Sequence, residues 1–225
     1  MERGGDVELF LITGIISSIV FFVGLFVGFA IGGEKISILE ESINDLQQEI
    51  QEINMQFNIL DVMNESASCD FLLSMADKME SQASSLGKRL EQMEVEGKIM
   101  TEEYTKLKKD YMLVLMNDWI TIEEIKRRCE TNITTVLYFY SNRYCPLCEE
   151  QASVLNYYKS ILGTGIMIFA LDTDLNMTII NSLLNTYDIT SYPSLLINGN
   201  VFKEYVSKED FKNKLCEFKD YSICG

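Results

Sequence analysis

The spacing of apolar residues changes twice along the chain and divides it into three zones. Residues 9–33 carry no charge, residues 34–130 place apolar residues at helical spacing among charged ones, and residues 131–225 contain short apolar runs. A helix repeats every 3.6 residues and a strand every two. These patterns predict an anchor helix, a long helical region and an α/β domain, in that order.

The first zone is long enough to cross a lipid bilayer. As a helix rising about 1.5 Å per residue, residues 9–33 would span about 37 Å, against about 30 Å for a hydrocarbon core. We therefore expect a single transmembrane anchor within residues 1–33. A cleaved signal peptide is the alternative, because small residues near position 30 offer a cleavage site, but the apolar stretch exceeds the usual 7 to 15 or so residues.

A heptad pattern follows the anchor within residues 34–62. Its apolar positions are Ile36, Leu39, Ile43, Leu46, Ile50, Ile53, Phe57 and Leu60. The first apolar position of each heptad is mostly β-branched (Ile36, Ile43, Ile50, Phe57) and the second is mostly leucine (Leu39, Leu46, Ile53, Leu60). This combination favours a parallel two-stranded coiled coil. We expect homodimerisation through this seam, and Gly24, Gly28 and Gly32 would let the anchors approach closely. A helix packed against its own chain is the alternative.

Residues 63–130 predict a helical hairpin. The first arm carries an apolar stripe of Leu72, Met75, Met79, Leu86, Leu90 and Met93, and the second carries Tyr104, Leu107, Tyr111, Leu115, Trp119 and Ile122. Gly97 suits the end of the first helix, and Thr101 followed by two glutamates suits the start of the second. Nothing in the hairpin has the pattern of a catalytic motif.

The chain is acidic, with a formal net charge of −15. Residues 34–130 hold 11 basic and 21 acidic residues and so supply most of this excess. A solvated helical stalk accounts for such a balance. Nucleic acid is not expected as a partner, because phosphate binding needs clustered lysine and arginine.

The last zone alternates strands and helices. Strands are expected at 136–140, 166–171, 194–197 and 201–205, and helices between the first two strands, at 176–187 and at 208–218. The turn sequence Asn198-Gly199-Asn200 joins the last two strands into a hairpin. The order βαβαββα predicts a mixed sheet covered by helices in residues 131–225, with the first two strands parallel because a helix connects them.

Few residue types in this chain are available for catalysis or metal binding. It contains no histidine, which excludes Ser-His-Asp and Cys-His catalysis and histidine-bound metals. Six cysteines remain, together with only two prolines, Pro146 and Pro193, where average usage predicts about 11.

Two of the cysteines lie in the motif Cys145-Pro146-Leu147-Cys148, at the end of the first predicted strand and the start of a helix. A thiol at a helix N-terminus faces unpaired N–H groups, which stabilise the thiolate and lower its pKa. We expect Cys145 to be the nucleophile and Cys148 to resolve the mixed disulfide that it forms. Pro146 is tolerated there because its missing N–H has no partner within the helix.

The other four cysteines are expected to form cross-links. Cys69 and Cys129 lie at opposite ends of the predicted hairpin, so antiparallel arms bring them together. Cys216 and Cys224 are close in sequence and are expected to bond to each other. The alternatives are two buried thiols in the hairpin, or a zinc site of the four C-terminal cysteines, for which the eight-residue spacing is poor.

Two motifs resemble the thioredoxin-like superfamily, over residues 134–218. The first runs from Phe139 to Cys148, and the second runs from Tyr187 to Gly199 and is similar to the family's cis-proline segment. The resemblance implies a thioredoxin-like α/β fold and disulfide chemistry without a bound cofactor. It also implies that Pro193 is cis and packs against the cysteine pair, with the Tyr192 backbone available to an extended substrate.

The chain departs from that family at two points. Phe139 stands where thioredoxins carry a buried aspartate, so proton transfer would use water or another group such as Glu149 or Glu150. Pro-Leu between the cysteines is closer to glutaredoxins and some disulfide oxidases than to thioredoxins. The direction of electron flow is therefore left open.

We expect a membrane-anchored thiol–disulfide oxidoreductase that exchanges, forms or isomerises disulfides in exported proteins, together with an electron-transfer partner. Structural disulfides favour an oxidising space outside the cytoplasmic membrane, although the flanking charges Arg3 and Lys35 balance. Sequons at Asn64, Asn132 and Asn176 permit glycosylation. The alternatives are a redox-inactive scaffold or docking subunit of a membrane assembly, and a cytoplasm-facing reductase or redox sensor.

Overall fold

The computed structural model describes residues 17–18, 21–23, 55, 59–60, 62–129 and 131–224. The chain divides into two units, Met1–Met63 and Asn64–Gly225. The elements of the second unit are, in chain order, α2 (Glu65–Val95), α3 (Glu102–Arg128), β1 (Thr134–Tyr140), α4 (Cys148–Leu162), η1 (Gly163–Gly165), β2 (Ile166–Asp172), η2 (Thr173–Leu175), α5 (Thr178–Thr186), β3 (Ser194–Ile197), β4 (Asn200–Phe202) and α6 (Lys208–Phe218).

Most of the predicted anchor, residues 9–33, and of the predicted dimer seam, residues 36–60, lies outside the described residues. Among the residues that are described, no helix combines the length and the apolar composition needed to cross a bilayer. The anchor and the homodimer therefore stay predictions.

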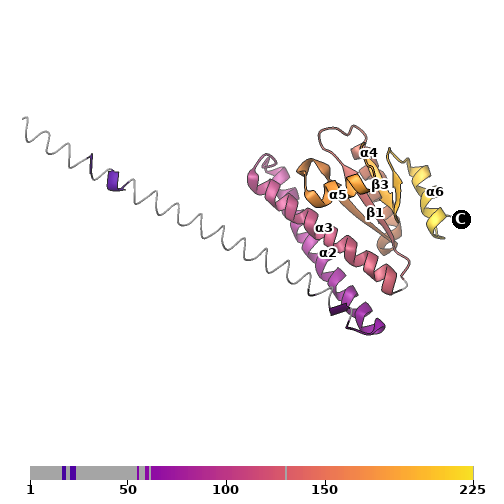
Figure 1. The fold of residues 1–225 in the computed structure, drawn as a ribbon. Helices are drawn as coiled ribbons and strands as arrows, with labels where there is room; N and C mark the ends of the chain where they lie inside the picture. The colour runs from indigo at the N-terminus through magenta and orange to yellow at the C-terminus, as the bar shows by residue number, and fades with distance from the viewer. Residues whose placement is uncertain are drawn as a thin grey trace, which may run out of the picture. The chain divides into compact units, whose positions relative to one another are not determined.

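The helical hairpin is formed by α2 and α3, which run antiparallel (Figure 1). Asn64 caps α2 by accepting the Ala67 N–H at 2.9 Å. Gly97 has a φ of 72° in the connecting turn, and the Thr101 hydroxyl accepts the Tyr104 N–H at 3.1 Å at the start of α3. The predicted turn is thus confirmed, with the left-handed backbone that glycine adopts without strain.

The sheet has the strand order β2-β1-β3-β4. β1 pairs in parallel with β2 and antiparallel with β3, and β3 pairs antiparallel with β4. This confirms the predicted mixed sheet. Asn198 and Gly199, with φ of 45° and 86°, form the turn between β3 and β4, where positive φ matches the twist of a tight hairpin.

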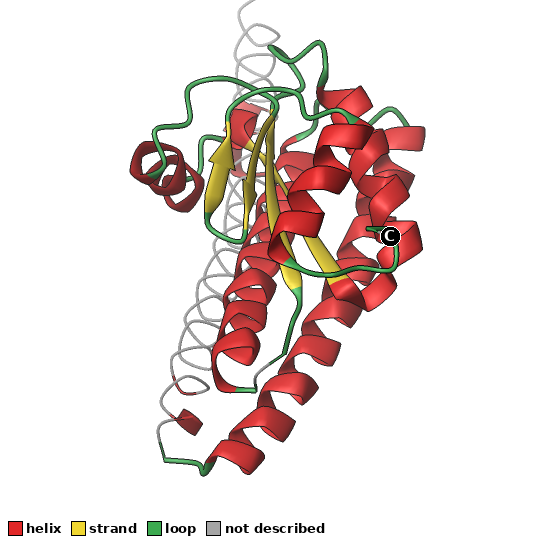
Figure 2. Cartoon of the chain, turned by 90° about the vertical axis from the view of Figure 1, so that its right-hand side faces the viewer, coloured by secondary structure: helices red, strands yellow, loops and turns green. Residues whose placement is uncertain are grey.

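Helices cover both faces of the sheet (Figure 2), and β1 is accordingly buried along nearly its whole length. One face packs against α4 and α6 in an apolar cluster that includes Val136, Tyr138, Leu155, Tyr158, Ile197, Phe211 and Leu215. On α3, Glu123 accepts the Thr135 hydroxyl, and the Lys126 ammonium donates to Asn198 at 3.0 Å. The second arm of the hairpin therefore covers part of the sheet, which the prediction of a solvated stalk did not include.

Two predicted elements are shorter in the structure. The strand expected at 201–205 ends at Phe202, because the next residues bond elsewhere: the Lys203 carbonyl accepts the Ser191 hydroxyl at 2.6 Å, and the Val206 N–H donates to Gln151 at 2.8 Å. The helix expected at 176–187 is confined to Thr178–Thr186. Asn176 has a left-handed φ of 51°, which a right-handed helix does not accommodate.

Candidate active site

Cys145 and Cys148 form a disulfide between β1 and α4, with their Cα atoms 5.4 Å apart. Only 7% of Cys148 is exposed, whereas Cys145 is half-buried and reaches solvent. The two cysteines therefore differ in exposure. Cys145 is the more accessible of the two, which fits the predicted division into a nucleophile and a resolving cysteine.

The helix after the pair begins at Cys148, later than the predicted start at Cys145. Pro146 disfavours helical backbone at Cys145, the residue before it. Pro146 and Leu147 form a turn ahead of α4, so Pro146 lies outside the helix that it was expected to open. Leu147 is the N-cap residue and supplies no side-chain hydrogen bond. The first-turn N–H groups of α4 thus keep their positive character beside Cys145, which favours a thiolate there.

The start of α4, which contains the buried Cys148, is held by hydrogen bonds to β1 and to the segment before α6. The Tyr138 hydroxyl on β1 donates to the Cys148 carbonyl oxygen at 2.7 Å. Gln151, which is fully buried on α4, accepts the Val206 N–H at 2.8 Å and donates to the Val206 carbonyl at 3.3 Å. These bonds fix the first turn of α4 against the sheet and against the segment before α6.

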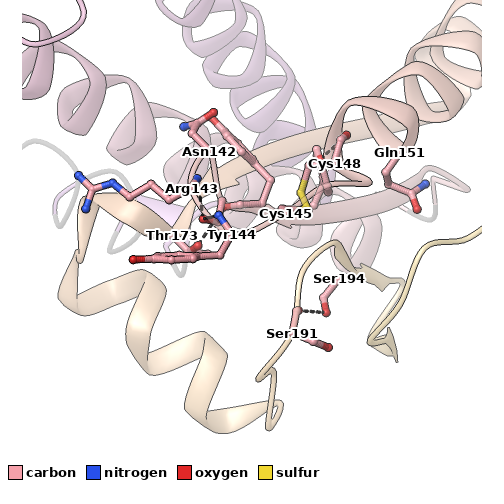
Figure 3. The surroundings of a disulfide bond; sticks show 12 residues. Asn142, Arg143, Tyr144, Cys145, Cys148, Gln151, Thr173, Ser191 and Ser194 are labelled. Carbon is pink, nitrogen blue, oxygen red and sulfur yellow. Dashed lines mark hydrogen bonds between the residues drawn. A yellow bond between two sulfur atoms is a disulfide. The ribbon is translucent and has the colours of Figure 1, made fainter.

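The bond between Tyr192 and Pro193 is cis, as the resemblance implies, and Pro193 is buried. Ser194 pairs with Phe139 at the end of β1, which places this segment beside the strand that leads to the cysteines. Tyr192 packs against the same apolar cluster as Cys145. Figure 3 shows the segment near the disulfide, with the Ser194 hydroxyl donating to the Ser191 carbonyl at 2.7 Å.

The loop before Cys145 is held by a hydroxyl and a carboxylate. The Ser141 hydroxyl donates to Asp174 at 2.8 Å, and its oxygen accepts the N–H groups of Arg143 and Tyr144, both at 3.1 Å. The other oxygen of Asp174 accepts the Asn142 N–H at 2.8 Å. Residues 141–144, which we call the active-site loop, therefore have three of their backbone N–H groups held by Ser141 and Asp174.

A second carboxylate connects this loop to the hairpin. Asp172, at the end of β2, is 2% exposed and lies 2.5 Å from the Lys108 ammonium on α3. The same carboxylate accepts the Asn142 side-chain amide at 2.8 Å and the Asp174 N–H at 2.9 Å. Sequence reasoning missed all of these residues. Two aspartates directly after a predicted parallel strand were the available signal, because the carboxyl ends of such strands meet at one sheet edge.

The surface around the disulfide is open. Pro146 is exposed, Leu147 is 44% exposed, and the Tyr144 side chain, 77% exposed, extends away from the sulfur atoms (Figure 3). Two surface hollows of about 490 and 530 Å³ lie along α3 and beside β4, and neither is lined by Cys145 or Cys148.

The strand that leads to the cysteine pair, β1, contains no aspartate or glutamate. Phe139 is fully buried where thioredoxins carry aspartate. Glu149 and Glu150, in the first turn of α4, are both exposed. A proton-transfer role for either glutamate stays a prediction.

The remaining four cysteines are paired as the sequence predicts. Cys69 bonds to Cys129 across the open end of the hairpin, and Cys216 bonds to Cys224 after α6, with Cα separations of 5.6 and 5.7 Å. The chain has no free cysteine. The alternatives of unpaired hairpin thiols and of a four-cysteine zinc site are therefore contradicted by the pairing.

No protein-family model matches this chain, and no curated protein matches it either. Among solved structures it is similar to the germline-specific thioredoxin Deadhead of Drosophila melanogaster, with 19% identity and a TM-score of 0.36 over 45% of this chain and 92% of that one. It is also similar to chloroplastic thioredoxin z, with 14% identity and a TM-score of 0.34 over 43% of this chain and 88% of that one. A third similar structure is MTB dsbF, with 14% identity and a TM-score of 0.32 over 40% of this chain and 84% of that one.

Proposed function

We propose that this chain, whose C-terminal sheet has a thioredoxin-like fold, is a thiol–disulfide oxidoreductase acting on protein thiols and disulfides. One observation carries the proposal: an accessible Cys145, a buried Cys148 and the cis-Pro193 segment occur together at the end of β1. A merely structural disulfide does not need unequal access to its two cysteines.

The reaction follows from the two sulfur atoms. In the reducing direction the Cys145 thiolate attacks one sulfur of a substrate disulfide and releases the other as a thiolate, leaving a mixed disulfide. Cys148 then loses its proton and attacks the Cys145 sulfur. This step frees the second substrate thiol and closes the Cys145–Cys148 bond, so two electrons pass to the substrate. Oxidation of a substrate dithiol is the same sequence reversed.

The substrate is an extended protein segment. The exposed Pro146 and the half-buried Tyr192 lie on segments next to Cys145, and we assign the Tyr192 backbone to pairing with the substrate chain. Pro193 has no N–H, so its neighbours supply the main-chain groups of that pairing. The open surface supports a protein as the partner.

The other two disulfides support an oxidising compartment. Cys69–Cys129 and Cys216–Cys224 are bonds of a kind that persists in oxidising spaces. We therefore assign the C-terminal unit to the outer side of the cytoplasmic membrane, acting on exported proteins. Residues 9–33 are assigned to a membrane anchor and residues 36–60 to a homodimer seam.

Turnover of insulin disulfides by the full-length protein in detergent, with dithiothreitol as the electron donor, tests the activity. We expect turnover above the uncatalysed rate by the wild type and none by Cys145→Ser. Reduced Cys148→Ser, incubated with insulin after the dithiothreitol is removed, should trap a mixed disulfide. The Cys216→Ser/Cys224→Ser double variant removes a disulfide away from the site and should keep turnover. Equal inactivity of the wild type and Cys145→Ser with every dithiol donor would leave a docking role instead.

A further inference from the structure

The Lys108–Asp172 ion pair connects the helical hairpin to the residues that precede the nucleophile. Asp172 is 2% exposed and the Lys108 side chain is 13% exposed. A buried carboxylate without its cation is strongly disfavoured, because its hydration has been removed. Lys108 therefore supplies a positive charge beside a buried carboxylate whose oxygens also accept hydrogen bonds.

Those hydrogen bonds are directed to the active-site loop. Asp172 accepts the Asn142 amide at 2.8 Å and the Asp174 N–H at 2.9 Å. Asp174 in turn accepts the Ser141 hydroxyl and the Asn142 N–H, both at 2.8 Å. The last member of the chain is Tyr144, whose N–H donates to the Ser141 oxygen at 3.1 Å and whose carbonyl carbon is bonded to the Cys145 nitrogen.

We propose that the Lys108–Asp172 pair is a positioning device that holds the active-site loop and thereby sets the thiolate stability of Cys145 and the reduction potential of the Cys145–Cys148 pair. The inference rests on the proposed function and assigns the hairpin a part in it. A loop held in one place keeps Cys145 against the first turn of α4, where the N–H groups stabilise a thiolate. Stabilising the thiolate stabilises the reduced form, so loosening the loop makes the pair more reducing.

The test measures the potential and the thiol titration directly in the full-length protein. The Cys145–Cys148 pair is equilibrated with dithiothreitol or glutathione redox buffers, and the rate of Cys145 alkylation is followed against pH. Lys108→Met removes the cation, and Lys108→Arg retains it. Lys109→Met is the matched control, since Lys109 is the exposed neighbour on the same helix.

A second variant covers the case in which Lys108→Met fails to fold. Asn142→Ala removes an exposed amide that bonds to Asp172 and leaves the buried charges paired. We expect Lys108→Met and Asn142→Ala to shift the dithiol–disulfide equilibrium about tenfold towards the disulfide, which is about 30 mV for a two-electron couple. The midpoint of Cys145 alkylation should move to higher pH. Lys108→Arg should recover part of the shift, and Lys109→Met should match the wild type.

A wild-type potential and alkylation profile in Asn142→Ala, and in Lys108→Met if it folds, would overturn the proposal, even if Lys108→Met is less stable. In that case the pair only supports the fold. Neither measurement uses a protein substrate. Shifted potentials in a protein that never turns over insulin would therefore uphold the positioning role and reject the proposed function.

Discussion

The Tyr138 hydroxyl, on the central strand, donates a 2.7 Å hydrogen bond to the carbonyl oxygen of Cys148. Burial raises the pKa of Tyr138 well above its ordinary value, so the phenol keeps its proton and stays a donor across the physiological range. The sheet therefore holds the resolving cysteine through a neutral bond that pH does not break.

Tyr138→Phe is expected to destabilise the folded protein. The ring remains, but a buried carbonyl loses its donor, and such a loss costs about 1 to 3 kcal/mol. Urea unfolding of the oxidised protein measures the free energy. Tyr140→Phe is the matched control, because the Tyr140 ring stacks on Tyr138 at 5.5 Å and its change keeps the bond to Cys148. An equal loss in the two variants would contradict the role given to this bond.

The two thiols of the reduced pair should react at different rates with iodoacetamide. Cys145 reaches solvent and Cys148 is 7% exposed, so mass mapping should find Cys145 modified first. Its rate should rise with a midpoint below the pKa of about 8.5 that is usual for a thiol, because the thiolate lies beside the first turn of α4. Equal labelling of both cysteines would contradict the assignment of roles.

Removal of the hairpin disulfide, in a Cys69→Ser/Cys129→Ser double variant, should lower the free energy of unfolding by about 4 kcal/mol. The bond closes a sequence separation of 60 residues, and the entropy lost by the unfolded chain grows with loop length. The matched variant lacking Cys216 and Cys224, separated by 8 residues, should lose about 2 to 3 kcal/mol. The reverse order in denaturant titrations would reject the loop-entropy account.

Asp118→Asn should stabilise the protein at pH 7 to 8. Asp118 is 5% exposed on α3, and its Oδ1 lacks a hydrogen-bond partner among the described residues. Burial, and secondarily repulsion from Glu80, raises the pKa of Asp118 to about 6, although Lys159 opposes the shift. Ionisation is therefore costlier in the folded state than in the unfolded state, and the penalty is complete above pH 6 or so.

The gain from Asp118→Asn should be about 1 to 3 kcal/mol at pH 8 and should vanish below a pH of about 4, where the carboxyl is protonated in both states. Thermal or urea unfolding across this range measures it. The exposed Asp77→Asn on α2 serves as the control for loss of one negative charge. A gain that is constant with pH would show that titration of Asp118 is not its cause.

Local patterns in the sequence were sufficient for much of the fold and for the centre of the site. The Cys145–Cys148 motif and Pro193 stand at element boundaries that the change of apolar period identifies. The Cys69–Cys129 bond follows because equal arms of an antiparallel hairpin bring their ends together. Within each cysteine pair the residues are close in sequence or related by one turn, so their geometry is nearly determined by secondary structure. The place of Pro193 near the active-site cysteines was implied only by the resemblance of its segment to a known family.

The contacts between α3 and the sheet could not be predicted in the same way. Lys108 and Lys126 appear in a charged helix with the pattern of a solvated stalk, yet their partners, Asp172 and Asn198, follow 64 and 72 residues later. No periodicity links such pairs, because they depend on how two layers of the fold are docked. The early end of β4 has a similar origin in the tertiary bonds of Lys203 and Val206.

The Cys69–Cys129 bond also determines which part of the folded unit carries a pulling force. Tension applied between the segment before Cys69 and the sheet passes across the two sulfur atoms and enters β1 a few residues after Cys129. The residues between the two cysteines, including Lys108, form a covalent loop outside that path. Pulling on the N-terminal end would therefore load the sheet before it stretched α3, and the contact between Lys108 and Asp172 would not bear the force directly.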